Sequence, residues 1–201
     1  MNKPAPAMED AAWITVKTPF TAAFLLDFIN DAERIIRINS LMVFSSWQQE
    51  TPDSYRISGK NLSTGKNFDT VITVERLQNG VVISYRDGLK AATRIELAEN
   101  GSDIIITDDY SAVPAAERES RLEEVDKSLI QWGHDIHRYL KNRKRYGFIP
   151  GYKYYMDRYW QFMKPSTRRI CAMLIMVTVA EFILFLAVFS VFWLEIDRFL
   201  D

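Results

Sequence analysis

The first residues that could do chemistry are two histidines, His134 and His137, with Asp135 between them. Residues three apart on a helix share a face, so both imidazoles could hold one metal ion if carboxylates joined from elsewhere. The single cysteine, Cys171, allows neither a cysteine-based zinc site nor an intrachain disulfide. Two ligands do not make a metal site. We therefore predict no metal site, and we expect His134 either on the protein surface or at the rim of a cavity.

The stretch ITDDYS brings Asp108, Asp109 and Tyr110 to the end of an apolar run. Neighbouring residues on a strand point to opposite faces, so the two carboxylates are not an acid–base pair by themselves. In one interpretation a carboxylate points inward and holds a polar group of a ligand, and Asp109 is our candidate for it. In the other, the two acids cap the strand end or the next turn.

Other polar side chains in β-rich stretches could anchor a ligand or simply face solvent, and of these Arg56 and Glu75 are our candidates for polar groups in a cavity. The motifs of the common enzyme classes are missing from the sequence, among them the nucleophile elbow, the phosphate-binding loops and the His-Glu-x-x-His zinc motif. We therefore assign no catalytic residue.

A run of short elements must position these residues. Residues 13–19 have the pattern of a strand, Thr21 can cap a following helix, and a second short helix is predicted around residues 31–40. The Asn-Gly pairs at 79–80 and 100–101 predict tight hairpins. These pairs lie within a series of six β-rich segments, at 41–50, 53–61, 68–78, 81–88, 89–99 and 102–111.

Two periodic patterns indicate which faces are buried. In the segment 89–97, alternate residues form one apolar face, with Lys90, Arg94 and Glu96 on the other; the apolar face consists of Leu89, Ala91, Thr93, Ile95 and Leu97. A long helix is predicted from about Pro114, with apolar residues at spacings of three and four that form one stripe facing a sheet. The stripe consists of Leu122, Val125, Leu129, Trp132, Ile136 and Tyr139.

This order of a strand, two small helices, six antiparallel strands and one long helix resembles the START-like (SRPBCC) superfamily of polyketide cyclase-like and lipid-transfer domains. The resemblance covers about residues 13–146 and lies in the element order. It implies an α+β helix-grip fold, in which a curved antiparallel sheet packs on the long C-terminal helix around a cavity for an apolar molecule. Quinone-binding START proteins and the membrane-attached accessory subunit of carbon monoxide dehydrogenases have a similar layout. The residues expected to line the cavity are Trp47, Tyr85, Ile95, Ile106 and Trp132.

Charge is distributed unevenly along the chain. Residues 1–137 carry 14 Lys+Arg and 21 Asp+Glu, residues 138–169 carry ten cations and one acid, and residues 170–201 carry one cation and four acids. This pattern indicates an acidic globular part, a basic segment and an apolar tail. Residues 1–12 lack the apolar core of a signal peptide and are predicted to form a flexible arm.

Residues 170–194 contain one ionisable side chain, Glu181, and are long enough to cross a hydrocarbon core roughly 30 Å thick. We predict a transmembrane helix here, with a buried core helix as the alternative. Cations precede this run and acids predominate after it. The positive-inside rule therefore places the preceding domain in the cytoplasm and residues 195–201 outside. The expected protein is a single-pass, tail-anchored protein of the cytoplasmic (inner) membrane.

Glu181 is costly at the bilayer centre, by about 2.5–3.5 kcal/mol when charged. Thr178 lies three residues earlier, on the same helical face, so the two side chains could contact a partner helix or a lipid. The alternative is a protonated glutamate that the surrounding apolar residues tolerate. A proton relay is disfavoured because the span has no second carboxylate and no histidine.

Residues 138–169 interleave ten cations with nine aromatic side chains. The pattern fits single-stranded nucleic acid or a membrane interface, and its position beside the span favours anionic lipid and argues against nucleic acid. GFIPG at 147–151 and Pro165 break the helix, which leaves a short surface helix over 152–163. The predicted interface, within 147–169, consists of Lys153, Tyr155, Arg158, Tyr159, Trp160, Lys164, Arg168 and Arg169.

Three functions remain open on these observations. The first is a membrane-tethered START-like module that binds or presents an apolar molecule, such as a lipid, an isoprenoid or a quinone. The second is an accessory subunit of a larger membrane complex, docked through its transmembrane helix near Glu181. The third is a cyclase or dehydratase, since START-like cyclases carry no common motif. We predict no cofactor other than such a bound lipid or quinone.

Overall fold

The computed structural model describes residues 11–88, 90–111 and 115–200, with the backbone alone at 115–127 and 197–200. Several expectations therefore lie outside the described residues. They concern the arm over 1–10, Leu89, the side chains of Leu122 and Val125, and most of the predicted outer tail. The chain divides into two compact units, Met1–Phe162 and Met163–Asp201.

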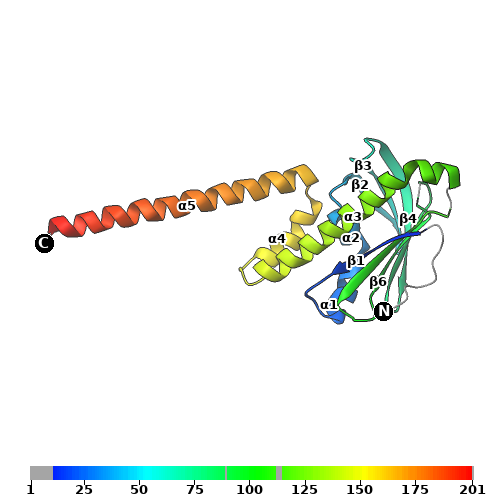
Figure 1. Cartoon of the computed structure of the whole chain (residues 1–201), viewed down its shortest axis with the longest axis horizontal. Helices are drawn as coiled ribbons and strands as arrows, with labels where there is room; N and C mark the ends of the chain where they lie inside the picture. Colours follow the sequence, from blue (N-terminus) through cyan, green and yellow to red (C-terminus); the bar gives the residue numbers. More distant parts are fainter. Residues whose placement is uncertain (1–10, 89, 112–114, 201) are drawn as a thin grey trace. The chain divides into compact units, whose positions relative to one another are not determined.

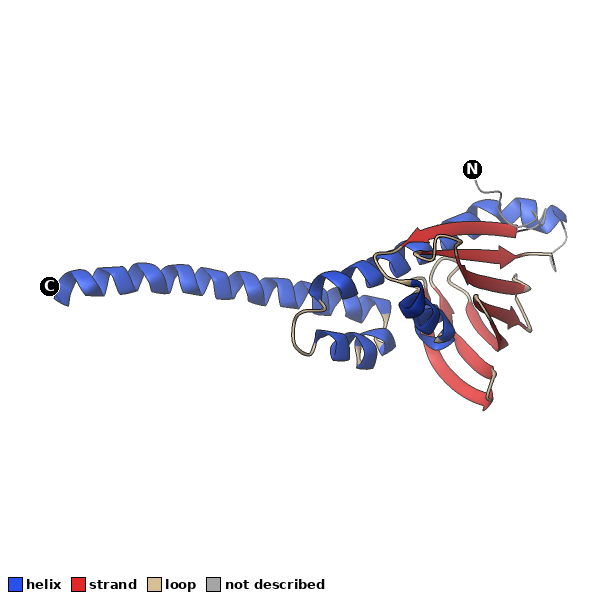
Figure 2. Ribbon diagram, turned by 90° about the horizontal axis from the view of Figure 1, so that it is seen from below, coloured by secondary structure: helices blue, strands red, loops and turns tan. Residues whose placement is uncertain are grey.

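Seven antiparallel strands form one sheet in the first unit (Figures 1 and 2). Their spatial order is β1-β7-β6-β5-β4-β3-β2, so six consecutive strands form a meander and β1 pairs with the last of them. All seven predicted strands are present. Their bounds are β1 Ala11–Lys17, β2 Met42–Thr51, β3 Ser54–Asn61, β4 Asn67–Leu77, β5 Gly80–Tyr85, β6 Ala92–Leu97 and β7 Asp103–Asp109.

The hairpin between β4 and β5 shows why the chain turns where it does. Leu77 pairs with Gly80 across a two-residue turn, as the Asn-Gly signal predicted. A Cβ added to Gly80 would lie 2.1 Å from the carbonyl oxygen of Ile95 on the neighbouring strand. Only glycine therefore allows β5 to approach β6 so closely at this point.

Alternate side chains of each strand point to the face of the sheet that carries the helices, and most of these side chains are apolar. On β6 this face buries Thr93, Ile95 and Leu97, as the alternation predicted. Lys90 was predicted to lie on the opposite face of this strand, and this prediction was wrong. It precedes β6, which begins at Ala92, so it is not bound by the alternation of the strand, and its ammonium reaches the inner face.

Two short helices, α1 Ala22–Asn30 and α2 Ala32–Ile38, follow β1 and pack on the apolar face of the sheet. Asp31 caps α2, because its side chain accepts a hydrogen bond from the backbone N–H of Arg34 at 3.0 Å. Thr21 stands at the N-cap of α1 in an extended conformation, but its side chain makes no capping hydrogen bond. The sequence therefore predicted the N-cap position correctly, but the capping hydrogen bond expected from the Thr21 hydroxyl is not made.

The long helix α3, Ala115–Tyr146, lies across the same face of the sheet as α1 and α2 (Figure 1). The described part of the predicted stripe, from Leu129 to Tyr139, is buried as expected. A Cβ on Gly133 would lie 2.7 Å from Cδ1 of Ile14, so the absence of a side chain lets α3 lie directly on β1. The indole N–H of Trp132 donates to the carbonyl of Ile35 at 3.0 Å and ties α3 to α2.

The chain beyond α3 folds back onto the same unit. The predicted surface helix over 152–163 is α4, Tyr152–Arg158, followed by the 3-10 turn η1, Trp160–Phe162. Two aromatic residues of the predicted membrane interface, Tyr155 and Trp160, pack against the hydrophobic core. The compact unit therefore extends to Phe162, beyond the predicted domain end at residue 146.

An ion pair at the end of α3 fixes α4. Arg143 donates to both carboxylate oxygens of Asp157, at 2.5 and 3.0 Å, and the hydroxyl of Tyr139 donates to the same carboxylate at 3.3 Å. Tyr139 is buried, and burial raises its pKa to about 12; the charge of Asp157 adds to this rise and that of Arg143 opposes it. The hydroxyl is therefore neutral throughout the physiological range.

The raised pKa of Tyr139 predicts a loss of stability in alkali. The unfolded chain ionises this tyrosine near pH 10 and the folded chain near pH 12, so the contribution is complete below pH 10 and decreases above it. We expect a loss of about 1.4 kcal/mol by pH 11 that is specific to this residue. Urea unfolding in mild detergent at pH 8 and pH 11 measures it. The difference between the two pH values should be smaller in Tyr139→Phe than in the wild type, and equal differences would contradict the prediction.

The second unit consists mainly of one helix, α5, Pro165–Leu200. Pro165, predicted as a break, is its first residue, where the missing N–H costs nothing. Within Pro165–Ile196, the most apolar stretch of 18 residues has a mean hydropathy of 2.6, and none of that stretch is buried. Among the described residues, α5 is the one helix that is long and apolar enough to cross a membrane.

Candidate functional site

A polar group interrupts the apolar inner face of the sheet at Asp108. Its side chain is fully buried, because Asp108 lies two residues after Ile106 on β7 and therefore points to the same inner face. It accepts hydrogen bonds from the hydroxyls of Thr93 at 2.5 Å and Tyr110 at 3.3 Å, and from the ammonium of Lys90. A buried carboxylate requires such donors, since its desolvation is otherwise unfavourable.

Lys90 is the cation that balances this charge. Its side chain is 24 % exposed, whereas that of Asp108 is completely buried. The ammonium also lies 5.7 Å from the ring centroid of Trp132 on α3, within cation–π range. Burial alone would lower the pKa of Lys90, but the negative charge of Asp108 and the hydrogen bond to it outweigh burial and raise the pKa. The ammonium is therefore charged at physiological pH.

Tyr85 extends the cluster toward β5. Its hydroxyl lies 3.3 Å from the hydroxyl of Thr93, and because Thr93 donates its own hydrogen to Asp108, Tyr85 is the donor of this pair. Burial raises the pKa of Tyr85, an effect that the charge of Lys90 opposes, so the side chain remains a neutral hydroxyl. We call Tyr85, Lys90, Thr93, Asp108 and Tyr110 the inner polar cluster.

The structure brings together four of the five residues that were predicted to line a cavity. Ile95 and Ile106 face each other in the register of β6 and β7, Trp132 lies over Lys90, and Tyr85 belongs to the inner polar cluster. Trp47 lies apart from them, in an aromatic group of its own on β2, β3 and β4. That group comprises Phe44, Trp47, Tyr55 and Phe68, with the guanidinium of Arg37 5.1 Å from the Trp47 ring.

The polar candidates from the sequence do not join the inner polar cluster. Arg56 and Glu75 are exposed and alternate with buried residues of their strands, and Arg56 pairs with Glu50 at 2.9 Å. Asp109 points away from Asp108 and accepts the backbone N–H two residues on at 2.8 Å, as a strand-end cap. His134 is exposed on α3.

Sequence reasoning missed Lys90, Thr93 and Asp108 as site residues. Strand parity could have found two of them, because Asp108 lies two residues from Ile106 and Thr93 two residues from Ile95, and both isoleucines were predicted to face inward. Lys90 stands just before β6, where no periodic pattern predicts the direction of a side chain.

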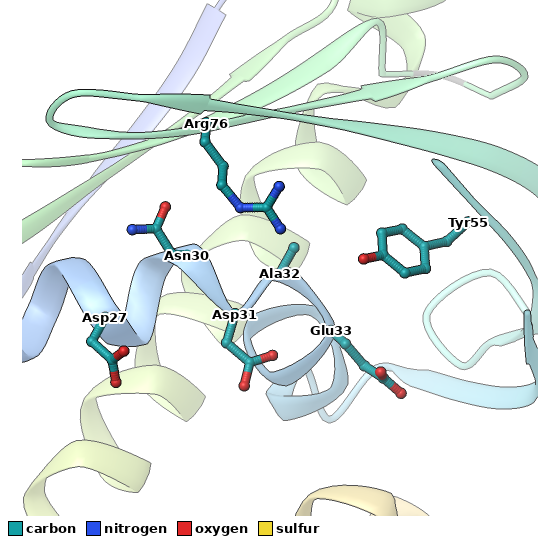
Figure 3. A pocket seen from close by; sticks show the side chains of 7 residues that line it. All are labelled: Asp27, Asn30, Asp31, Ala32, Glu33, Tyr55 and Arg76. Carbon is teal, nitrogen blue, oxygen red and sulfur yellow. The ribbon is translucent and has the colours of Figure 1, made fainter. Parts of the chain in front are cut away.

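A hollow of about 350 Å³ lies away from the inner polar cluster, between the sheet and the junction of α1 and α2 (Figure 3). Arg76 extends from β4 toward this junction, and its guanidinium pairs with Asp53 at 2.5 Å. Within the described ranges, no group of three or more His, Cys, Asp or Glu could hold a metal ion. The lining residues, several of them exposed and paired locally, are Asp27, Asn30, Asp31, Ala32, Glu33, Tyr55 and Arg76.

No protein-family model and no curated protein matches the chain. Similar solved structures include a hypothetical protein from Sulfolobus tokodaii, 15% identical over 68% of this chain and 99% of that one, with a TM-score of 0.49. An AHSA1-like protein from Aeromonas hydrophila is 12% identical over 64% of this chain and 92% of that one, with a TM-score of 0.40. The di-domain ARO/CYC of the BE-7585A biosynthetic pathway is 15% identical over 62% of this chain and 48% of that one, with a TM-score of 0.40.

These neighbours are SRPBCC-like proteins, and the likeness is one of fold. The class follows from the chain's own architecture. A strand, two short helices, a six-stranded meander and a long helix packed on the sheet form the helix-grip fold expected from the START-like resemblance.

Proposed function

We propose that the protein is a membrane-tethered START-like module that binds an apolar molecule with a polar end, such as a lipid, an isoprenoid or a quinone, at the cytoplasmic membrane surface. The observation that carries the proposal is α5, an apolar helix without burial that follows a helix-grip domain. Such a helix is unstable in water and finds its partner in a bilayer.

The length and flanks of α5 support the tether. Its 36 residues extend about 54 Å, more than the roughly 30 Å of hydrocarbon that a span must cross. Lys164, Arg168 and Arg169 precede the apolar run, and Glu195 and Asp197 follow it. The positive-inside rule favours a cytoplasmic position for the helix-grip domain.

The inner polar cluster supports a ligand with one polar end. An ammonium has three donors, and the hydrogen bond to Asp108 uses one of those of Lys90. Lys90 can donate to a carbonyl or phosphate oxygen, and the neutral hydroxyl of Tyr85 can do so by turning its hydrogen from Thr93 to the ligand. The hydrocarbon part of the ligand would lie against Ile95, Ile106 and Trp132, the apolar residues beside the cluster.

Native mass spectrometry of the full chain, gently solubilised from its own membrane, tests the proposal. We expect a mass excess of a few hundred daltons per chain. Tyr85→Phe should lower the bound fraction by roughly fivefold to tenfold, the value of one hydrogen bond of about 1 kcal/mol or slightly more. Tyr55→Phe is the matched control, because its hydroxyl contacts Pro52 at 3.4 Å, away from the cluster. A wild-type chain without any bound small molecule, or equal binding by both variants, would contradict the proposal.

Glu181 favours a second candidate, an accessory subunit of a membrane complex. It is the one ionisable side chain within residues 170–194, and Thr178 lies on the same helical face. A partner helix with a hydrogen-bond donor would compensate the cost of a carboxyl group in hydrocarbon. Release of distinct protein chains in the same mass spectra would support this candidate over the carrier.

A further inference from the structure

The turn between α3 and α4 presents apolar side chains to solvent. Phe148 is 81 % exposed and Ile149 is 43 % exposed, and Tyr154 on α4 is 62 % exposed. Single exposed apolar residues are ordinary on a protein surface, whereas several within seven residues of the chain are typical of a contact surface. We call Phe148, Ile149, Lys153, Tyr154 and Arg158 the docking surface.

The turn is held by hydrogen bonds that fix the direction of its tip. The backbone N–H of Ile149 donates to the carbonyl oxygen of Tyr146 at 3.0 Å, and the backbone N–H of Tyr152 donates to the carbonyl oxygen of Ile149 at 3.1 Å. Gly151 has a φ of +79°, a conformation that favours glycine, and it directs the chain into α4. The tip is therefore pre-organised, and binding through it would cost little additional ordering.

The two faces of α4 differ in what they contact. Its inner face buries Met156 and packs Tyr152 and Tyr155 against the core of the domain. Its outer face carries Lys153, Tyr154 and Arg158, all of them exposed. An apolar or aromatic group rimmed by cations is the pattern of a helix that lies on a membrane surface.

The charge of this region favours an anionic partner. Residues 138–164 contain eight Lys or Arg and one acid, Asp157. That acid is neutralised by both hydrogen bonds from Arg143, so it does not offset the cations of the outer face. Anionic lipid headgroups attract Lys and Arg side chains that lie close to the membrane surface.

The connection to α5 favours lipid over nucleic acid as the partner. Two residues, 163 and 164, lie between the end of η1 at Phe162 and the first residue of α5 at Pro165, so the Cα atoms of Phe162 and Pro165 are at most about 11 Å apart. If α5 crosses the bilayer, this end of the domain lies at its surface. This step rests on the proposed function.

We propose that the docking surface is a second membrane contact, in which Phe148 and Ile149 insert into the headgroup region of an anionic bilayer while Lys153 and Arg158 bind lipid headgroups. The span tethers the domain, and the docking surface restricts its orientation. A domain held by the span alone would tumble about residues 163–164.

Spin labelling of the full chain tests this contact. On a Cys171→Ser background, a nitroxide is attached at Phe148→Cys, or at Leu62→Cys as the control, an apolar residue of the β3–β4 turn that is 46 % exposed. Each chain is placed in vesicles of phosphatidylcholine alone or with phosphatidylglycerol. We expect the nitroxide at 148 to show a several-fold higher ratio of oxygen to water-soluble nickel accessibility when phosphatidylglycerol is present. The nitroxide at 62 should remain in water in both.

Three outcomes would overturn the contact. In a chain that floats with the vesicles, the nitroxide at 148 could be as accessible to water as the one at 62. This result would contradict the docking surface and leave the tether in place. A signal at 148 that changes with single-stranded RNA and not with lipid assigns the surface to nucleic acid. Failure of the chain to float with any vesicle contradicts both the tether and the docking surface.

The double variant Lys153→Glu with Arg158→Glu should abolish insertion of the nitroxide at 148 into the bilayer. If the nitroxide still inserts, these two cations do not have the role given to them.

Discussion

Replacing Asp108 with alanine should lower the free energy of unfolding of the helix-grip domain by about 3–4 kcal/mol. The change removes the acceptor shared by Lys90, Thr93 and Tyr110 and leaves a cation on the inner face without its counter-charge. The partial exposure of Lys90 lets water reach the ammonium, so the loss should fall toward the lower end of the range for buried pairs. Urea unfolding of the full chain in mild detergent, followed by circular dichroism, measures the effect.

The neighbouring carboxylate provides the control. Asp109→Ala removes one capping hydrogen bond on the other face of the same strand and should cost about 1 kcal/mol or less. Removing both charges together, in Lys90→Met with Asp108→Leu, should recover much of the lost stability, because two apolar side chains leave no buried charge unpaired. Equal losses for Asp108→Ala and Asp109→Ala would show that the ion pair does not hold the inner face together.

The ion pair bears on function because a general stability advantage does not explain a pair of charges at this position. A buried pair is often no more stable than well-packed apolar side chains of similar volume. Lys90 and Asp108 therefore have no evident structural advantage over residues such as Ile95 and Ile106 beside them. Their place on the face that the helix-grip fold turns toward α3 is the reason that we assign the polar end of a ligand to them.

The fold was predictable from the sequence because its signals are local and repeated. The turn residues separate the strands, the alternation gives each strand a face, and the stripe from Leu129 to Tyr139 gives α3 one side to bury. The Asn-Gly pair at residues 79–80 fixed the register of β4 and β5. These features depend on residues close together in the chain.

The site was harder to predict because its contacts join distant residues. Asp108 and Thr93 meet through the register of β6 and β7, and Lys90 reaches them from a loop. For Tyr155 and Trp160, composition suggested a membrane surface. In the structure the Arg143–Asp157 ion pair holds α4 against the domain, and Tyr155 on α4 and Trp160 on η1 both pack against the core. An aromatic side chain fits either environment, so composition alone could not decide between them.

Two lysines on α5 should abolish its insertion. In Val179→Lys with Ile183→Lys, both charges lie two residues from Glu181 and so do not share its helical face. Each lysine near the bilayer centre costs about 3 kcal/mol, so the pair should change the insertion equilibrium by roughly four orders of magnitude. We expect the chain to move from the carbonate-resistant membrane fraction to the supernatant, or to be degraded. The measurement is quantitative immunoblotting of both fractions.

The control adds the same charges to the same helix outside the apolar run. Ser166→Lys with Thr167→Lys extends the cations that precede the span and should leave the chain in the membrane fraction. Carbonate extraction removes proteins held only by headgroup contacts, so the docking surface cannot mask a failure of the span. If the Val179 and Ile183 lysines leave the chain resistant to carbonate, α5 is covered by protein instead of lipid, and the subunit candidate replaces the tethered carrier.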